Sequence, residues 1–582
     1  MRIGCPARAV LVAALLLALP NSGTSLAADP ASIPAASPPR AAIWPASTWS
    51  GLHVGVHAGG FGATTSFSDP NGPALYGGFV ETPGFAAGLQ LGYDWTVGRQ
   101  WLLGVEASVS TLSGDSHNTC QQATTYFIGS NCKVGPRELA TLTGRLGVVT
   151  GPQHRTLLYG KGGLAYLRSE ISINPNNAFG NLAGTTLSGQ PTQGDPTIRS
   201  AALWGWTIGG GLEHALTPRW SAVFDYSYMH FDGLALPTPE STNVNTVGAV
   251  ANQGGGVSGV SQNVQLFKIG LNYRFGGRAT ADEEGQGGLY DGHGARRDAR
   301  APWTPSWEFD VGGRYWYSSG KYQIVNGSGN ELLSRLTYDR LAGHAGELFG
   351  RVDTPIDFFV KGLVGGGFVS SGRMFDEDWG LSGVGEPAVA YEVTQSAVSG
   401  SFNYLTADLG YNLSRGPDHK FGLFAGYNRY QMVLSAFGCT QLVNPASEVC
   451  TTPTPGNINV ISQIDTWHSL RIGASAELQV LDRVRIAGDL AWLPYVYVDA
   501  LDIHHLRQPP MYSPLAGNGR GVQAELILTW QATEHLSLGV GARYWAMWTK
   551  TAAVAGLTAD GFNMNTERYG IFLQGSYRFR PG

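Results

Sequence analysis

Four of the five cysteines form two pairs that are close in the sequence, and each pair could form a disulfide bond. Cys120 lies near Cys132, and Cys439 lies near Cys450, and each pair brackets a polar segment. Neither pair has the Cys-x-x-Cys spacing or the clustered histidines of a metal site, so no metal ligands are predicted. In an oxidising compartment we expect one disulfide per pair.

The sequence carries none of the common motifs for nucleotide, zinc or serine chemistry. A P-loop, an HExxH helix and a nucleophile elbow are all absent. No helix is expected after the glycine-rich stretches at 59–63, 209–215 and 365–371, so they are interpreted as strand glycines and not as phosphate loops. The formal net charge of -5 is too small to indicate a polyanionic partner. We therefore expect no cofactor and no nucleic-acid partner.

The first 27 residues have the three parts of a secretory signal peptide. Arg2 and Arg8 supply a basic start, residues 9–19 form an apolar core, and Ser25-Leu26-Ala27 offers small residues for cleavage. The apolar core is too short to cross a bilayer as a helix. Cys5 lies ahead of this core and would be removed with it. Residues 28–47 are rich in Pro and Ala and are predicted to be a linker.

The composition is typical of a membrane β-barrel. Charged residues make up 14% of the chain, against an average near 25%, while Gly reaches 81 and aromatic residues 11%. Apolar residues that face lipid and aromatic girdles at the interfaces produce such a composition. An array of soluble β-sandwiches is the alternative, and the layout of the strands must decide between the two.

Residues 48–277 contain eight segments in which apolar and polar residues alternate, as in β-strands. Short turns (VGRQ, GPQH and TPR) alternate with long polar connections around residues 66–80, 115–137, 173–200 and 234–260. Transmembrane barrels have short periplasmic turns and long extracellular loops, whereas a sandwich has no reason for this alternation. We therefore predict an eight-stranded transmembrane barrel.

A second alternating block occupies residues 306–582, after a charged, glycine-rich segment at residues 278–305. An even strand number returns the chain to the periplasm, so the segment is predicted to be a periplasmic linker with a span of roughly 30 Å. Ten strands are expected in the second block, with short turns at TPID, RGPDH, LD and TEH. The predicted fold is all-β, with an eight-stranded and then a ten-stranded antiparallel barrel in a bacterial outer membrane. The aromatic endings at Tyr273 and Phe275, and at Tyr577 and Phe579, suit the barrel assembly machinery as a partner.

The first block resembles the small eight-stranded outer-membrane proteins of alphaproteobacteria, the opacity-protein-like porin family. The opening WSGLHVGVHAGG and the closing FKIGLNYRFGG carry this resemblance. It implies a fold and a location but no mechanism. Because side chains fill the interior of an eight-stranded barrel, no large pore is expected.

The second block resembles the omptins, ten-stranded outer-membrane aspartyl-type endopeptidases. The segments LLSRLTYD, RMFDEDW, FAGYNRY and ALDIHH carry the resemblance. Omptins hold one Asp pair in D-x-D-W and an Asp-His pair in D-x-H, both at the outer rim. Carried over, these are Asp376 with Asp378 and Asp502 with His504, which the resemblance implies to be catalytic.

We call these four residues the quartet. Together they could activate a water molecule for hydrolysis. His504 would deprotonate a water molecule while Asp502 orients and stabilises the imidazole. Asp376 and Asp378 would share a proton, and the protonated carboxyl would donate a hydrogen bond to the carbonyl under attack. The alternative interpretation is that all four are ordinary solvated residues of extracellular loops.

Strand parity places a condition on this hypothesis. Val484, Ile486, Leu490 and Trp492 have the spacing of lipid-facing residues, and strict alternation would put Asp502 and His504 on the same side. A bulge or a twist above the membrane, for which Pro494 marks a candidate position, must turn them inward. The same difficulty applies to Asp376.

Two positions depart from the omptin pattern in ways that affect substrate choice. Ile324 and Ala500 stand where the family carries acids that receive a basic side chain, although Asp499 is adjacent. Tyr427 matches a lipopolysaccharide contact of the family, but Arg429 and Gln431 replace the glutamate and arginine that follow it. Basic-residue specificity and lipopolysaccharide dependence are therefore not predicted.

Two functions remain open from the sequence. One is hydrolysis of a peptide substrate at the extracellular rim of the second barrel. The other is a non-enzymatic surface role in envelope integrity, adhesion or passage of small solutes. Both require outer-membrane lipid around the barrels, with lipopolysaccharide as a candidate lipid partner.

Overall fold

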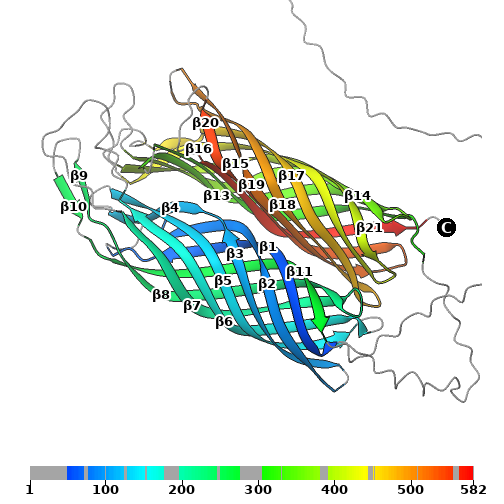
Figure 1. The fold of residues 1–582 in the computed structure, drawn as a ribbon. Coiled ribbons are helices and arrows are strands. Elements are labelled where there is room, and N and C mark those ends of the chain that lie inside the picture. Colours follow the sequence, from blue (N-terminus) through cyan, green and yellow to red (C-terminus); the bar gives the residue numbers. More distant parts are fainter. Residues whose placement is uncertain are drawn as a thin grey trace, which may run out of the picture. The chain divides into compact units, whose positions relative to one another are not determined.

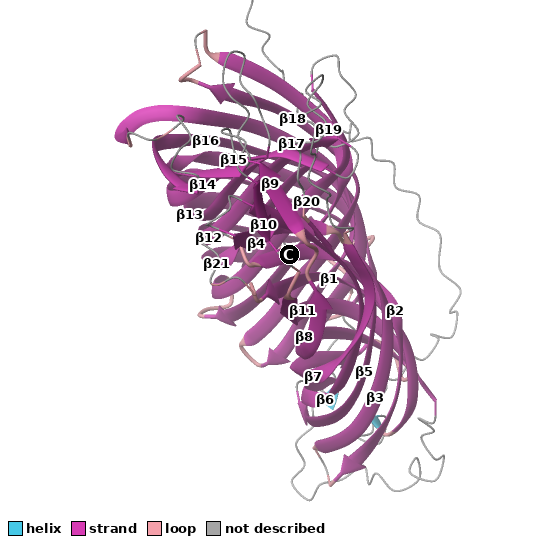
Figure 2. Ribbon diagram, turned by 90° about the vertical axis from the view of Figure 1, so that its left-hand side faces the viewer, coloured by secondary structure: helices cyan, strands magenta, loops and turns pink. Residues whose placement is uncertain are grey.

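A computed structural model describes residues 49–580 with several gaps. The gaps are residues 71, 73–76, 99, 124–127, 151–153, 176–195, 245–249, 254, 276–303, 329–330, 380–390, 444–449, 451–452, 508 and 555–562. The predicted signal peptide, the Pro- and Ala-rich linker and almost all of the predicted periplasmic linker lie outside the described residues. What is described is built almost entirely of strands (Figure 2). None of its helical turns is long and apolar enough to cross a membrane.

Eight antiparallel strands close the first barrel, as the sequence predicts (Figure 1). The ring runs in the order β3-β2-β1-β11-β8-β7-β6-β5, and pairing between β3 and β5 closes it. Its strands are β1 (Gly51–Phe67), β2 (Phe79–Val97), β3 (Trp101–Ser113), β5 (Ile128–Thr150), β6 (Thr156–Asn174), β7 (Thr197–Ala215), β8 (Trp220–Pro237) and β11 (Val257–Phe275).

Two of the connections predicted as long loops contain further strands. β4 (Ser116–Ala123) pairs with the extended first part of β5, and β9 (Ser241–Val244) pairs with β10 (Val250–Gln253). The sequence interpretation described segments 115–137 and 234–260 as long polar connections and did not identify the strands within them. The alternation of apolar and polar residues missed them because strands beyond the lipid have no apolar face to display.

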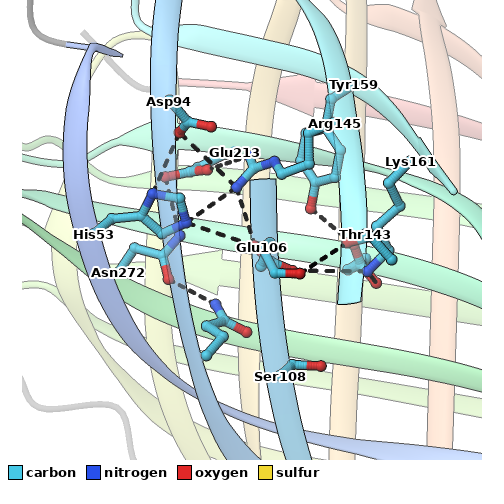
Figure 3. A network of polar contacts seen from close by, with 12 residues as sticks. His53, Asp94, Glu106, Ser108, Thr143, Arg145, Tyr159, Lys161, Glu213 and Asn272 are labelled. Carbon is cyan, nitrogen blue, oxygen red and sulfur yellow. Dashed lines mark hydrogen bonds and ion pairs between the residues drawn. The ribbon is translucent and has the colours of Figure 1, made fainter. Parts of the chain in front are cut away.

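Alternation fixes which side chains fill the first barrel. Leu89 and Leu91 of β2 are 58% and 50% exposed on the outer face, while Gln90 between them is buried inside. A network of buried charged and polar side chains lies inside the first barrel (Figure 3). Arg145 donates hydrogen bonds to Glu106 at 3.0 Å and to Glu213 at 2.9 Å.

The same network extends across the first lumen through further ion pairs. Arg274 meets Glu213 at 2.7 Å, and Lys161 meets Asp225 at 2.7 Å. Towards the long-loop end the lumen is instead packed with apolar side chains, among them Phe61 and Met229. The prediction of a filled interior without a large pore is thus supported over the described residues.

The second barrel is a closed ring of ten consecutive antiparallel strands, as predicted. Its strands are β12 (Glu308–Ser328), β13 (Glu331–Asp353), β14 (Phe358–Trp379), β15 (Tyr391–Arg415), β16 (His419–Val443), β17 (Thr454–Leu481), β18 (Val484–His504), β19 (Met511–Gln531), β20 (Leu536–Val554) and β21 (Asn563–Phe579). Short turns join β13 to β14, β15 to β16, β17 to β18 and β19 to β20 at one end, so the long connections share the other end.

An aromatic girdle marks the outer limit of the membrane on the second barrel. Tyr427 and His468 are joined by a 2.6 Å hydrogen bond, and the ring of His468 lies 6.4 Å from that of Tyr497. Tyr315 and His344 make a second such pair at 2.7 Å. A strand needs only about 9–11 residues to cross the lipid, whereas β17 has 28. The strands therefore continue well beyond this girdle, and the region beyond it lies outside the lipid.

Candidate active site

The structure places all four quartet residues inside the second barrel, beyond the aromatic girdle. Asp376 and Asp378 end β14, while Asp502 and His504 end β18. Three strands separate β14 from β18 on one side of the ring and five on the other, so the two pairs lie almost opposite each other. We call this end of the lumen the mouth.

A bulge on β18 turns Asp502 and His504 inward. Leu493 pairs with Gly521 and Val496 with Gly519, so β18 has one residue more than its neighbour between these pairs. The same extra residue appears against β17. Trp492 is 37% exposed on the outer face before the bulge, whereas Val496 and the even-numbered residues after it are on the inner face. The predicted bulge at Pro494 is confirmed.

Strand β14 also contains a register irregularity that turns its acidic residues inward. Val369 pairs with Gly400 and Arg373 pairs with Ala397, which leaves one residue more on β14 than on β15. Val369 faces inward before this point, and Met374 faces inward after it, both within the buried core. Asp376 and Asp378 follow Met374 in steps of two and share its face.

Asp502 and His504 form a hydrogen-bonded pair. His504 Nε2 lies 2.9 Å from Asp502 Oδ2. Asp502 is 6% exposed, and its other carboxylate oxygen, Oδ1, has no hydrogen-bond partner among the described residues. If Nε2 carries the proton that Asp502 accepts, the second ring nitrogen, Nδ1, is left with its lone pair. This is the arrangement of a base that a carboxylate orients.

Asp376 and Asp378 form an acid pair in which the charged state is costly. Burial, together with the charges of Asp378 and Glu392, holds the pKa of Asp376 well above its ordinary value. Burial and the charge of Glu392 raise the pKa of Asp378 to about 7, against a hydrogen bond from Ser334 and the charge of His504. The acid pair therefore holds at least one proton at neutral pH, and this proton can be donated.

The two pairs interact across the mouth. The charge of His504 lowers the pKa of Asp378, and the charge of Asp502 raises the pKa of Asp376. The two pairs of the quartet therefore influence each other electrostatically across the mouth.

Asp465 and Tyr322 form a floor beneath the quartet that the sequence interpretation missed. Tyr322 Oη donates a hydrogen bond to Asp465 Oδ1 at 2.9 Å, and Gln463 Nε2 donates another at 2.6 Å. Tyr322 is on β12 and Asp465 on β17, five strands away, so their bond crosses the lumen. Tyr338 lies beside Tyr322, is fully buried and has no hydrogen-bond partner among the described residues.

A second hydrogen bond crosses the lumen nearer to the short-turn end of the barrel. Arg568 of β21 donates a hydrogen bond to Tyr430 Oη of β16 at 3.1 Å. Trp316, Tyr404 and Trp545 pack edge to face at the same level. A cavity of about 150 Å³ lies beyond them on the short-turn side, lined by charged side chains of both signs. Within the described residues, the mouth is therefore a cup with a closed base and not a channel.

The two positions that depart from the omptin acids are apolar and inward. Ile324 is 6% exposed and Ala500 is 3% exposed, and both belong to the buried hydrophobic core of the barrel. Asp499 next to Ala500 points outward and is exposed. On the outer face, Arg429 donates a 2.8 Å hydrogen bond to Asn403.

Both predicted disulfides are present. Cys120 of β4 is bonded to Cys132 of β5 with the Cα atoms 5.5 Å apart. Cys439 of β16 is bonded to Cys450 in the connection to β17, with a Cα separation of 5.9 Å. Each bond ties down a long-loop connection beyond the lipid.

Comparison with known proteins agrees with the barrel architecture of the first block. Residues 30–275 match the family model of the outer membrane protein beta-barrel domain. The 31 kDa outer-membrane immunogenic proteins of Brucella melitensis and Brucella suis are each 25% identical to this chain over 245 residues, covering 41% of this chain and 89% of the relative.

Solved structures with similarity to parts of the chain are also outer-membrane proteins. The outer membrane protease OmpT from Escherichia coli is 15% identical, with a TM-score of 0.38, covering 48% of this chain and 99% of the other. Ail, the attachment invasion locus protein of Yersinia pestis, is 15% identical with a TM-score of 0.17, covering 39% of this chain and 99% of the other. Similarities at this level carry no argument about activity.

Proposed function

We propose that this protein, a bacterial outer-membrane β-barrel protein, hydrolyses peptides at the extracellular mouth of its second barrel. One observation carries the proposal: a bulge on β18 turns the hydrogen-bonded Asp502–His504 pair inward, opposite the Asp376–Asp378 acid pair on β14. A strand that only had to span lipid would need neither the inward turn nor the buried carboxyls.

In the proposed reaction, His504 acts as the general base. A water molecule between the two pairs loses a proton to Nδ1 of His504 while its oxygen attacks the carbonyl carbon of a peptide bond. Asp502 accepts the Nε2–H hydrogen bond and stabilises the imidazolium that forms. When the C–N bond breaks, His504 returns the proton to the leaving amine.

The acid pair stabilises the oxygen on which negative charge develops. The protonated member of Asp376 and Asp378 donates a hydrogen bond to the carbonyl oxygen as the tetrahedral intermediate forms. A neutral carboxyl is the right donor because a carboxylate would repel that oxygen. The raised pKa of Asp378, about 7, supplies this neutral form at neutral pH.

Replacement of Asp502 by Asn tests the proposal in cells that display the full chain. We expect Asp502→Asn to lower kcat/KM for peptides by about 10²–10⁴-fold, because the imidazole loses its orienting charge. Cleavage of a fluorogenic peptide library by intact cells measures this. Asp499→Asn is the matched control, since Asp499 lies on the same strand but points outward.

Two results would contradict the proposal. One is equal cleavage by the wild type and Asp502→Asn when heat-modifiability on a gel shows both to be folded. The other is cleavage by the wild type no faster than by cells that lack the protein. Either result leaves a non-enzymatic surface role in envelope integrity, adhesion or small-solute passage.

A further inference from the structure

A ring of apolar side chains lines the mouth between the quartet and the floor. Its five members are Ile324, Leu336, Ala500, Leu515 and Met564. All belong to one hydrophobic cluster, and their exposed fractions range from 0% for Met564 to 6% for Ile324 and Leu336. We call this set the apolar ring.

One wall of the ring leads directly to the acid pair. Leu336 of β13 is the register partner of Asp376, and Ile324 of β12 is the partner of Leu336 on the other side. Met564 of β21 continues the row as the partner of Ile324. A substrate carbonyl held by Asp376 would therefore have its neighbouring side chain against these three residues.

The other wall leads to the base. Ala500 is on the same face of β18 as Asp502, two residues earlier, and Leu515 of β19 is the register partner of Ala500. The apolar ring is thus continuous with both halves of the quartet. The apolar ring therefore lies directly beneath the place where the bond would be cut.

Two charged groups near the ring already make hydrogen bonds. Asp465 pairs with Ala500 in register and is fully buried; its Oδ1 accepts hydrogen bonds from Tyr322 and Gln463, while its Oδ2 has no hydrogen-bond partner among the described residues. Arg568 lies deeper and donates to Ser318 at 2.9 Å and to Tyr430. A lysine or arginine in the ring would lose its water, and none of the five ring side chains could pair with its charge, which is unfavourable.

We propose that the apolar ring receives an uncharged, apolar side chain of the peptide next to the bond that is cut. This specificity rests on the proposed peptidase function. Its physical basis is that an apolar side chain gains from leaving water in this ring, whereas a cationic one pays for desolvation.

The test compares peptides that differ at one residue only. The full chain, purified and reconstituted in outer-membrane lipid, is given fluorogenic peptides with Leu, Phe, Lys, Arg or Glu next to the cleaved bond. We expect kcat/KM for Leu and Phe to exceed that for Lys and Arg by about 100-fold. The double variant Ile324→Glu with Ala500→Asp should reverse this preference, because it adds two carboxylates to the ring.

A matched variant separates the position of the charge from its mere presence. Leu501→Asp adds one carboxylate beside Ala500 but on the opposite face of β18, and should leave the preference unchanged, whereas the single variant Ala500→Asp should weaken it. The wild-type preference is itself a test that needs no variant to fold.

The outcomes distinguish this inference from the proposed function. Preference of the wild type for Lys or Arg, with cleavage abolished in Asp502→Asn, would overturn the apolar specificity and leave the peptidase in place. Cleavage that Asp502→Asn does not reduce, or no cleavage of any peptide, would overturn the peptidase and the specificity together.

Discussion

Asp465 places a carboxyl group where its ionised form is unfavourable. Burial raises its pKa to about 7, against the hydrogen bonds from Gln463 and Tyr322, and the charge of Asp502 reinforces the rise. An unfolded Asp has a pKa near 3.9, so between about pH 4 and pH 7 the folded protein holds a proton that the unfolded chain has lost. The free energy of unfolding therefore falls as pH rises through this window.

Asp465→Asn should remove this pH dependence. The amide keeps an oxygen for Tyr322 and Gln463 but never ionises. Relative to the wild type we expect the variant to gain stability from pH 4 to pH 8, by at most about 4 kcal/mol for a shift of about 3 pH units. Urea unfolding in lipid vesicles across this pH range measures it, with the exposed Asp499→Asn as the control. A difference that stays constant with pH would contradict the prediction.

At the residue scale the sequence identified the outer half of the site and missed the inner half. Asp376, Asp378, Asp502 and His504 stand in short spaced motifs that a family resemblance makes visible. Tyr322, Tyr338 and Asp465 are single residues on three separate strands, and only ring closure brings Tyr322 and Asp465 together. Whether these side chains face inward depends on β-bulges in their strands. The alternation of apolar and polar residues does not show how many bulges precede a given position.

At the element scale, the bulge on β18 determines whether Asp502 and His504 face the lumen. Side-chain direction has a period of two, so one extra residue reverses every position that follows. The sequence indicated where the bulge must fall because the apolar residues up to Trp492 and the acidic motif beyond it require opposite parity. Strands β4, β9 and β10 gave no such signal, because polar strand pairs outside the lipid resemble loops.

Deletion of Pro494 should turn Asp502 and His504 to the outer face of the barrel. The lipid-embedded part of β18 keeps its register, so we expect a folded barrel with peptide cleavage reduced by at least about 100-fold. Pro494→Ala keeps the residue count and should keep both the bulge and most of the activity. Activity of the deletion variant comparable to the wild type, with heat-modifiability intact, would show that the bulge does not orient the pair.

At the scale of the whole molecule, both barrels have occupied interiors. In the first, His53, Arg145 and Arg274 surround the carboxylates of Asp94 and Glu213, and apolar side chains fill the other half of the lumen. In the second, the Tyr322–Asp465 and Arg568–Tyr430 bonds cross the lumen. The number of strands and the two-barrel layout were evident from loop lengths, but these crossings depend on side chains from opposite walls.

The full chain should therefore conduct little current. In planar bilayers we expect no long-lived open-channel steps, because opening either lumen requires several buried ion pairs or hydrogen bonds to break together. A general porin in the same bilayer serves as the positive control. Stable, reproducible steps from the purified wild type would contradict the prediction and favour passage of small solutes.

The closed base of the mouth also determines where the fragments of a cut peptide would go. With the Tyr322–Asp465 and Arg568–Tyr430 bonds beneath it, the cup formed by the described residues is open only at its outer end, where substrate would enter and both fragments would leave. Such an enzyme would degrade material outside the cell without importing any of it.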